Sequence, residues 1–436
     1  MTRLTTRATT SLAAALALAA LGALAVPGSA APPTGAPGPG YIATSNVTHV
    51  LTVPLDTDIA GGRLVGKDFF VRTAKGITVY DATNPALPTP KGFVAVPATP
   101  NQEREDIDTN GKILVTGQSY DGILYVVDIR NRTAPTILSV LPGAAGHTNT
   151  CVLDCTFVYS SEGDIVDLRD PAAPKLLPQK WNRVSGARTG HDLTEVRPGF
   201  LVAASNPVAY LDARNPVAPT LLASGVVPDN LYVHGTAWPR AGKDRFILAG
   251  TETGVGCQGE LGTFNVFDTK NIKKKALTRI GGYALERGLP TDLKGQAPVA
   301  QHCGHWFDVH PSFKDGGLVA MAWYTSGVRF LGVSSKGVVE ERGFWQPLPG
   351  QSSAVYWVSP DTVWVTDYTA RAIDVLRFDT KAPAEKDAAL PGRFYPAGTG
   401  PVTTHAADHH SVAALADKWV CRPAGAVAPL GRPTAA

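Results

Sequence analysis

Short apolar runs separated by turn residues dominate this chain, and their pattern is typical of strands. The clearest example begins with the alternating segment 191–196, which is followed by the turn residues Arg197-Pro198-Gly199. Further apolar runs follow at 200–204, 208–212 and 220–224. The pattern predicts one antiparallel meander of four strands. A meander of this size cannot bury its own faces, so it requires neighbouring copies.

The chain contains such copies, each marked by two apolar residues, an Asp and a turn that ends in proline. Four clear copies are VYDATNPALP from Val79, VVDIRNRTAP from Val126, IVDLRDPAAP from Ile165 and YLDARNPVAP from Tyr210. Three degenerate copies are VFDTKNIKKK from Val266, FLGVSSKG from Phe330, with Gly332 in place of the Asp, and RFDTKAPA from Arg377.

Seven units with a period near 40 to 50 residues and four strands each are typical of a propeller. We therefore predict an all-β protein, a seven-bladed β-propeller of four-stranded antiparallel blades. The repeated Asp is interpreted first as structural, because a carboxylate at the end of a third strand accepts hydrogen bonds from the N–H groups of the following turn.

The repeated motif resembles the LVIVD repeat of bacterial secreted and surface β-propellers, over roughly Val47 to Thr380. This resemblance implies the architecture of the chain. It implies little about activity, because propellers serve binding, scaffolding and catalysis alike.

The first 30 residues are typical of a secretory signal peptide, with Arg3 and Arg7 before an Ala/Leu-rich segment and small residues at 28–30. We expect a Pro/Gly-rich spacer at 31–43, the propeller at 44–400, and a C-terminal tail at 401–436 that packs on or closes the propeller. Which terminus supplies the closing strand is left open. The chain is expected to be secreted or otherwise extracytoplasmic, with no membrane span.

The formal net charge is +3, and two of the basic residues lie in the expected signal peptide. Because no basic stripe is present, nucleic acid is not an expected partner. The expected partners are a small molecule, a glycan or a protein at the loop face or the channel mouth of a monomer.

Five cysteines in an exported chain are expected to pair. Cys151 and Cys155 bracket a predicted hairpin turn and form the first expected disulfide. Cys257 and Cys303 form the second expected pair, which leaves Cys421 either free or as a replacement partner in one of these two pairs. The alternative is that Cys151 and Cys155 bind a metal together with His147, which would also require a turn between the two cysteines.

Histidines provide the candidate chemistry. Aligned on their repeats, four units begin their first strands with His147, His191, His234 and His305, while Glu105 and Ser353 or a neighbour occupy this register in two others. First strands of propeller blades line the central channel, so these side chains are expected to converge. His302 and His310 flank His305, and on a regular strand neither would share its face.

We therefore predict His147, His191, His234 and His305 as metal ligands, with His310 as a further candidate and Glu105 as a ligand or a general base. Copper, zinc and iron all suit imidazole ligands, and an open coordination position would support oxidation or hydrolysis of a small molecule. The architecture is also similar to the selenium-binding protein and methanethiol oxidase propellers, which implies copper. The alternative interpretations are histidines that hydrogen-bond strand ends in a structural role, and a non-catalytic envelope or extracellular binding propeller.

Overall fold

A computed structural model describes the fold, and this description concerns the compact unit that begins at Pro37. The described residues are 40–57, 59–96, 107–118, 122–144, 146–227, 232–239, 241–252, 262–285, 304–348, 350–368, 370–386 and 392–396.

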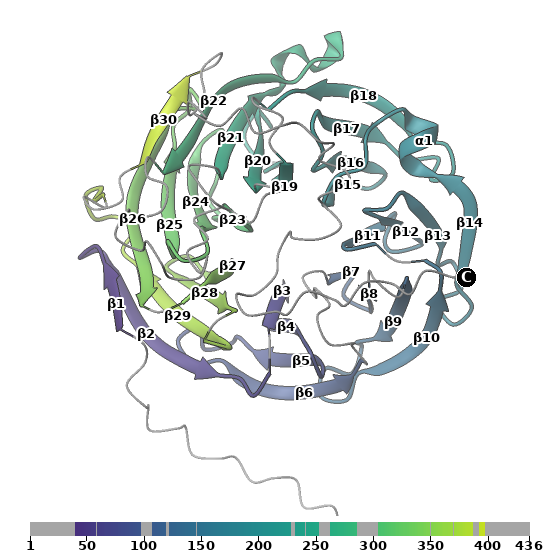
Figure 1. Cartoon of the computed structure of the whole chain (residues 1–436), viewed down its shortest axis with the longest axis horizontal. Helices are drawn as coiled ribbons and strands as arrows, with labels where there is room; N and C mark the ends of the chain where they lie inside the picture. Colours follow the sequence, from purple (N-terminus) through teal and green to yellow (C-terminus); the bar gives the residue numbers. More distant parts are fainter. Residues whose placement is uncertain are drawn as a thin grey trace, which may run out of the picture. The chain divides into compact units, whose positions relative to one another are not determined.

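The described strands form seven antiparallel sheets around a central axis, so the predicted seven-bladed propeller is confirmed (Figure 1). The first four blades follow the chain order. They are β3 (Ile59–Val65), β4 (Asp68–Thr73), β5 (Gly76–Asp81) and β6 (Thr89–Ala95); β7 (Asp108–Thr109), β8 (Ile113–Gln118), β9 (Ile123–Asp128) and β10 (Thr136–Pro142); β11 (Asn149–Val152), β12 (Phe157–Ser160), β13 (Asp164–Asp167) and β14 (Lys175–Lys180); and β15 (Leu193–Arg197), β16 (Phe200–Ala203), β17 (Val208–Asp212) and β18 (Thr220–Gly225).

The fifth and sixth blades each carry an additional strand, and the seventh combines the N-terminal strand β2 with three strands from the C-terminal part of the described chain. These blades are β19 (Tyr232–Ala237), β20 (Phe246–Glu252), β21 (Thr263–Asp268) and β22 (Thr278–Leu285) with β30 (Gly392–Pro396); β23 (Phe307–Val309), β24 (Gly317–Ala322), β25 (Val328–Val333) and β26 (Val339–Leu348) with β1 (Gly40–Ala43); and β27 (Ser352–Ser359), β28 (Thr362–Asp367) and β29 (Ala372–Phe378) with β2 (Val47–Pro54). The described helices are α1 (Trp181–Ser185) and the 3-10 helix η2 (Thr269–Lys274). Within the described residues, no helix has the length and apolar character needed to cross a membrane.

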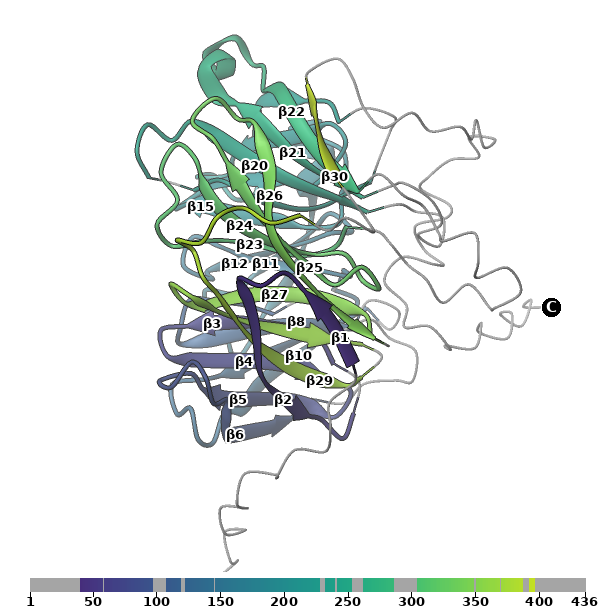
Figure 2. The same ribbon diagram turned by 90° about the vertical axis from the view of Figure 1, so that its left-hand side faces the viewer.

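The ring is closed by the N-terminal strand β2, which pairs with β29 in antiparallel register from Val47↔Phe378 to Pro54↔Ala372. The side view shows β1 and β2 lying against the C-terminal blades (Figure 2). Residues 40–43, expected in the spacer, form β1 and pair with β26. The expected signal peptide and the tail 401–436 lie outside the described residues.

Burial explains why the blades need one another. The middle strands β8 and β9 are mostly buried, whereas the outer strand β10 is mostly exposed. Among the described residues, seven apolar clusters each join two neighbouring blades. One of them packs Phe69 and Val71 of the first blade against Trp364 and Ile373 of the seventh, so closure buries surface that a single blade would expose.

The repeated Asp has the structural role expected of it. The Asp81, Asp128 and Asp212 carboxylates each accept a hydrogen bond from the backbone N–H two residues later, at 2.7–3.1 Å. Side-chain hydrogen bonds from the residue at that position, which is Thr83, Arg130 or Arg214, lower the carboxyl pKa values most, and these backbone hydrogen bonds lower them further. At Asp128 and Asp212 the Arg also forms an ion pair. The motif therefore stabilises the turn between the third and fourth strands.

Candidate metal centre

Four of the predicted histidines form a continuous row of rings on neighbouring blades. His147, His191 and His305 precede the inner strands β11, β15 and β23, and His234 lies within β19. Ring centroids are 4.5 Å apart for His147 and His191, 3.6 Å for His191 and His234, and 4.1 Å for His234 and His305. The predicted convergence of these four side chains at the channel therefore holds in the structure. His147 is half-buried and the other three are buried.

Glu252, at the end of β20, completes a candidate metal-binding group that the sequence did not reveal. Its Oε2 lies 3.8 Å from His234 Nε2, and its Oε1 accepts a 2.8 Å hydrogen bond from the Tyr324 hydroxyl. One donor atom each from His234, Glu252 and His305 lies within 4.8 Å of the other two. All three residues are fully buried. The structure therefore brings together two imidazoles and a carboxylate that could hold a metal ion.

His305 is oriented by the seventh blade. Its Nδ1 contacts the backbone carbonyl oxygen of Ser353, the residue predicted to share its register. Because a carbonyl oxygen only accepts hydrogen bonds, Nδ1 carries the proton in this contact, and the lone pair of the neutral ring is then on Nε2. Histidine ligands of metals are commonly held in this way through their other nitrogen. The ring also lies 4.5 Å from that of Tyr324.

His310 does not belong to this group, which corrects its prediction as a candidate ligand. Its Nδ1 is 2.7 Å from Ser312 Oγ and its Nε2 is 2.7 Å from the backbone oxygen of Pro360. Its ring packs edge-on against Trp357, with centroids 4.7 Å apart. The strand β23 separates His305 from His310, so the two side chains lie at opposite ends of one inner strand.

Several predicted residues lie outside the described part of the chain. They are Glu105, the candidate ligand or general base; His302; the expected disulfide partners Cys257 and Cys303; and Cys421.

The other expected cysteine pair is confirmed. Cys151 and Cys155 have an S–S distance of 1.96 Å and a Cα–Cα distance of 4.3 Å, and the bridge closes the turn between β11 and β12. Leu153, Asp154 and Cys155 all have positive φ, so the chain does turn between the two cysteines. Both sulfurs are committed to the bridge, and the alternative of a metal site formed by these cysteines with His147 is therefore not supported.

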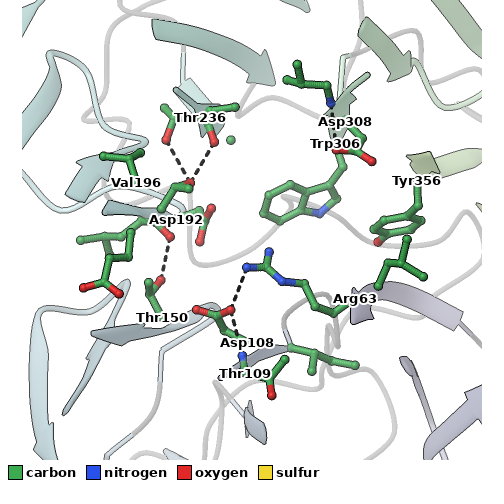
Figure 3. Close-up of a pocket in the computed structure, with 18 of the residues that line it drawn as sticks. Arg63, Asp108, Thr109, Thr150, Asp192, Val196, Thr236, Trp306, Asp308 and Tyr356 are labelled. Atoms are coloured by element: carbon green, nitrogen blue, oxygen red, sulfur yellow. Dashed lines mark hydrogen bonds and ion pairs between the residues drawn. The ribbon is translucent and has the colours of Figure 1, made fainter. Parts of the chain in front are cut away.

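A cavity of about 790 Å³ lies at the other end of the inner strands, with lining residues from all seven blades (Figure 3). Its lining includes Trp306, whose ring centroid is 4.7 Å from that of His234 and 5.7 Å from that of His191. The indole therefore lies between the cavity and the histidine row.

Polar side chains at one register of the inner strands link neighbouring blades beside this cavity. Each lies three residues after the register of the histidines or of Glu105. The bonds are Cys151 N–H to Asp108 Oδ2 at 2.9 Å, Thr150 Oγ1 to Leu193 O at 2.8 Å, Thr194 Oγ1 to Thr236 O at 2.8 Å, and Trp357 N–H to Asp308 Oδ2 at 2.8 Å. They fix the positions of the inner strands relative to one another.

Two carboxyl groups of the cavity wall have raised pKa values. Burial raises the pKa of Asp308 to about 6, against the hydrogen bonds that it accepts from Trp357 and Val309 and the positive charge of Arg63. Burial also raises the pKa of Glu195, although its Oε1 accepts backbone hydrogen bonds from Leu153 and Gly199. Restricted access to water at this end of the channel therefore favours the neutral forms.

Comparison with known proteins identifies the fold alone. No known protein family and no curated protein matches the sequence. Among solved structures, a hypothetical selenium-binding protein from Sulfolobus tokodaii aligns with 78% of this chain and 93% of its own at 12% identity and a TM-score of 0.52. Hydrazine synthase from Kuenenia stuttgartiensis aligns with 76% and 98% at 13% identity and 0.51. The Cps50 (Swd1) propeller domain from Myceliophteria thermophila aligns with 74% and 99% at 11% identity and 0.51.

Proposed function

We propose that this chain is an extracytoplasmic, LVIVD-like β-propeller that binds one transition-metal ion at His234, Glu252 and His305. The proposal rests on one observation: the donor atoms of these three buried side chains lie within 4.8 Å of one another. Ligand atoms around an ion with bonds of about 2.1 Å lie roughly 3.4 Å apart in tetrahedral geometry. Small side-chain rotations would therefore bring the three donors into a coordination sphere.

The surrounding hydrogen bonds support this assignment. The carbonyl of Ser353 orients the His305 ring, and the Tyr324 hydroxyl occupies one oxygen of Glu252 while the other faces His234. Such outer contacts restrict the rotamers of the ligands and thereby lower the entropic cost of binding. The row continues to His191 and then to the half-buried His147, and both residues offer further imidazole nitrogens.

Two imidazoles and one carboxylate suit iron, copper and zinc. A metal held by three protein ligands keeps coordination positions for water or a substrate, and it would supply Lewis-acid or redox chemistry there. We therefore propose oxidation or hydrolysis of a small molecule as the activity. Trp306 would separate this chemistry from the cavity on the other side of the indole.

Metal analysis of purified protein tests the proposal. Protein stripped with EDTA and dialysed against Cu(II), Zn(II) or anaerobic Fe(II) should retain about one equivalent of one of these ions per chain. Glu252→Gln and His305→Ala should lose it, whereas the control His310→Gln should retain it. A wild-type protein that retains no stoichiometric metal, or cluster variants that retain as much as the control, would refute the proposed centre.

A second candidate function is ligand binding by a non-catalytic propeller. The observation that favours it is the axial cavity, because its wall is built from all seven blades and combines charged and aromatic side chains. In this case the histidine row would have a structural role. The His→Ala variants would then change stability without changing ligand capture at the cavity.

A further inference from the structure

The axial cavity has a chemical character of its own, distinct from the histidine row. The charged residues of its lining are one basic residue, Arg63, and five acidic residues: Asp108, Asp154, Asp192, Glu195 and Asp308. Arg63 Nη2 lies 2.9 Å from Asp108 Oδ1, so this pair compensates itself. Asp154 lies 3.9 Å from Lys112 Nζ in an exposed ion pair, and Asp192, Glu195 and Asp308 still leave the lining with more acidic than basic side chains. A cleft lined mainly by one sign of charge favours ligands of the opposite sign.

Asp192 is the carboxylate best placed to meet a ligand. It is only 8% exposed, although it belongs to the cavity wall. Figure 3 shows Asp192, Arg63 and the indole of Trp306 directed toward the same central space from three different blades. A carboxylate in such a setting interacts more strongly with a cation than an exposed one does, because little water screens the pair.

Aromatic side chains supply the second half of the recognition. Trp306 is half-buried and presents its ring to the cavity, and Tyr356 lies on the wall beside it (Figure 3). The Tyr356 hydroxyl accepts a 2.7 Å hydrogen bond from the Gly62 backbone N–H, which fixes the position of that ring. Aromatic faces attract organic cations through the ring quadrupole, and tryptophan does so most strongly.

From this combination we infer that the axial cavity binds a small organic cation, such as an amine or a quaternary ammonium compound, between the carboxylate of Asp192 and the indole of Trp306. The volume of about 790 Å³ falls within the range of small-molecule pockets. Binding of a cation would also favour the ionised forms of Asp308 and Glu195, whose pKa values burial raises in the structure. The inference does not depend on metal binding at the histidine row.

Calorimetric titration with a matched pair of probes tests this inference. Choline and its uncharged isostere 3,3-dimethylbutan-1-ol have the same shape and differ in charge. At pH 7.5 and low ionic strength, EDTA-treated wild-type protein should bind one choline per chain, and the isostere should bind at least tenfold more weakly. The same choline affinity in Glu252→Gln would separate this site from the proposed metal centre.

Three variants locate the binding site. Asp192→Asn and Trp306→Leu should each weaken choline binding at least tenfold. Asp170→Asn serves as the control, because Asp170 lies in a surface turn where Asn84, Asn131 and Asn215 stand in other repeats. If Asp192→Asn fails to fold, Trp306→Leu carries the test. The inference is overturned if choline does not bind, if the isostere binds equally well, if a neutral sugar binds in place of choline, or if the cavity variants match the control.

Discussion

The rings of His234 and His305 lie 4.1 Å apart although 71 residues separate them in the sequence, and Glu252 is within reach of both. His234 lies in the inner strand β19 and His305 directly precedes the inner strand β23 of the neighbouring blade, so their contact follows from the circular arrangement of the repeats. Three buried groups of this kind rarely gather for packing alone, because polar side chains in a protein interior must be compensated.

Metal should stabilise the folded protein. An ion that binds the native state alone adds about 2.7 kcal/mol to the free energy of unfolding at a free concentration of 100 times its Kd. We expect guanidinium unfolding of the stripped wild type to move to higher denaturant when the preferred ion is added. Glu252→Gln should show no such change, while His310→Gln should respond like the wild type. An equal shift in Glu252→Gln would place the ion elsewhere.

The Tyr324 hydroxyl should tune metal affinity without touching the metal. Tyr324→Phe keeps the ring that packs 4.5 Å from His305 and removes the 2.8 Å hydrogen bond to Glu252. Loss of such an orienting contact typically weakens metal binding about 10- to 100-fold. Competition with a chromogenic chelator would measure the Kd. Tyr159→Phe is the matched control, because that buried hydroxyl donates to the Pro216 carbonyl in another part of the ring. Equal affinities in the two variants would contradict the positioning role.

The sequence predicted the features that repeat. Seven copies of an apolar pair with a turn defined the blades, and the register of His147, His191, His234 and His305 within them predicted their convergence. The same reasoning placed Ser353 or a neighbour at this register of the seventh blade, and the structure has the Ser353 carbonyl oxygen in contact with the His305 ring. These predictions succeeded because propeller geometry converts an equivalent position in the repeat into an equivalent position around one axis.

Features that do not repeat could not be found in this way. Glu252 closes the second strand of its blade, and the corresponding strands end in different residues, such as Gln118 and Ser160. The available signal was one carboxylate at the end of the apolar run FILAGT. His310 was included because of its closeness to His305 in sequence, yet β23 carries it to the other end of the channel. Ring closure by β2 was undecidable, because either terminus could supply an outer strand.

Asp308 should make stability depend on pH in a specific direction. Burial raises its pKa to about 6 in the folded state, above the value near 4 of an unfolded chain. The folded protein then binds more protons than the unfolded chain between these values. The contribution of Asp308 is therefore most favourable below about pH 4, and it is lost as the pH rises through about 6. The groups that face Asp308 are Arg63, His310 and the Trp357 and Val309 N–H donors.

Asp308→Asn should remove this component of the pH dependence. We expect the decrease in the free energy of unfolding between pH 4.5 and pH 7 to become smaller by about 1–2 kcal/mol, since Asp308 is only half-buried and solvent screening reduces the effect of the full shift. Urea unfolding at a series of pH values would give the slope of the free energy of unfolding against pH. A change in stability that the amide causes equally at every pH does not alter this slope. His310→Gln separates the contribution of the neighbouring imidazole. An unchanged slope in Asp308→Asn would show that this carboxyl titrates normally.

The Cys151–Cys155 bridge should contribute modestly to stability and should matter for the cavity wall. Closing so short a loop lowers the conformational entropy of the unfolded chain, which adds about 2 kcal/mol to the free energy of unfolding. The bridged turn is also held from both sides, because Leu153 N–H donates to Glu195 and the Asn110 amide donates to the Asp154 carbonyl. We expect the Cys151→Ser, Cys155→Ser double variant to unfold at lower denaturant and to bind choline more weakly. Its metal content should equal that of the wild type, because the histidine row lies at the other end of the inner strands. A double variant that loses metal as readily as His305→Ala would show that the two ends of the channel are coupled.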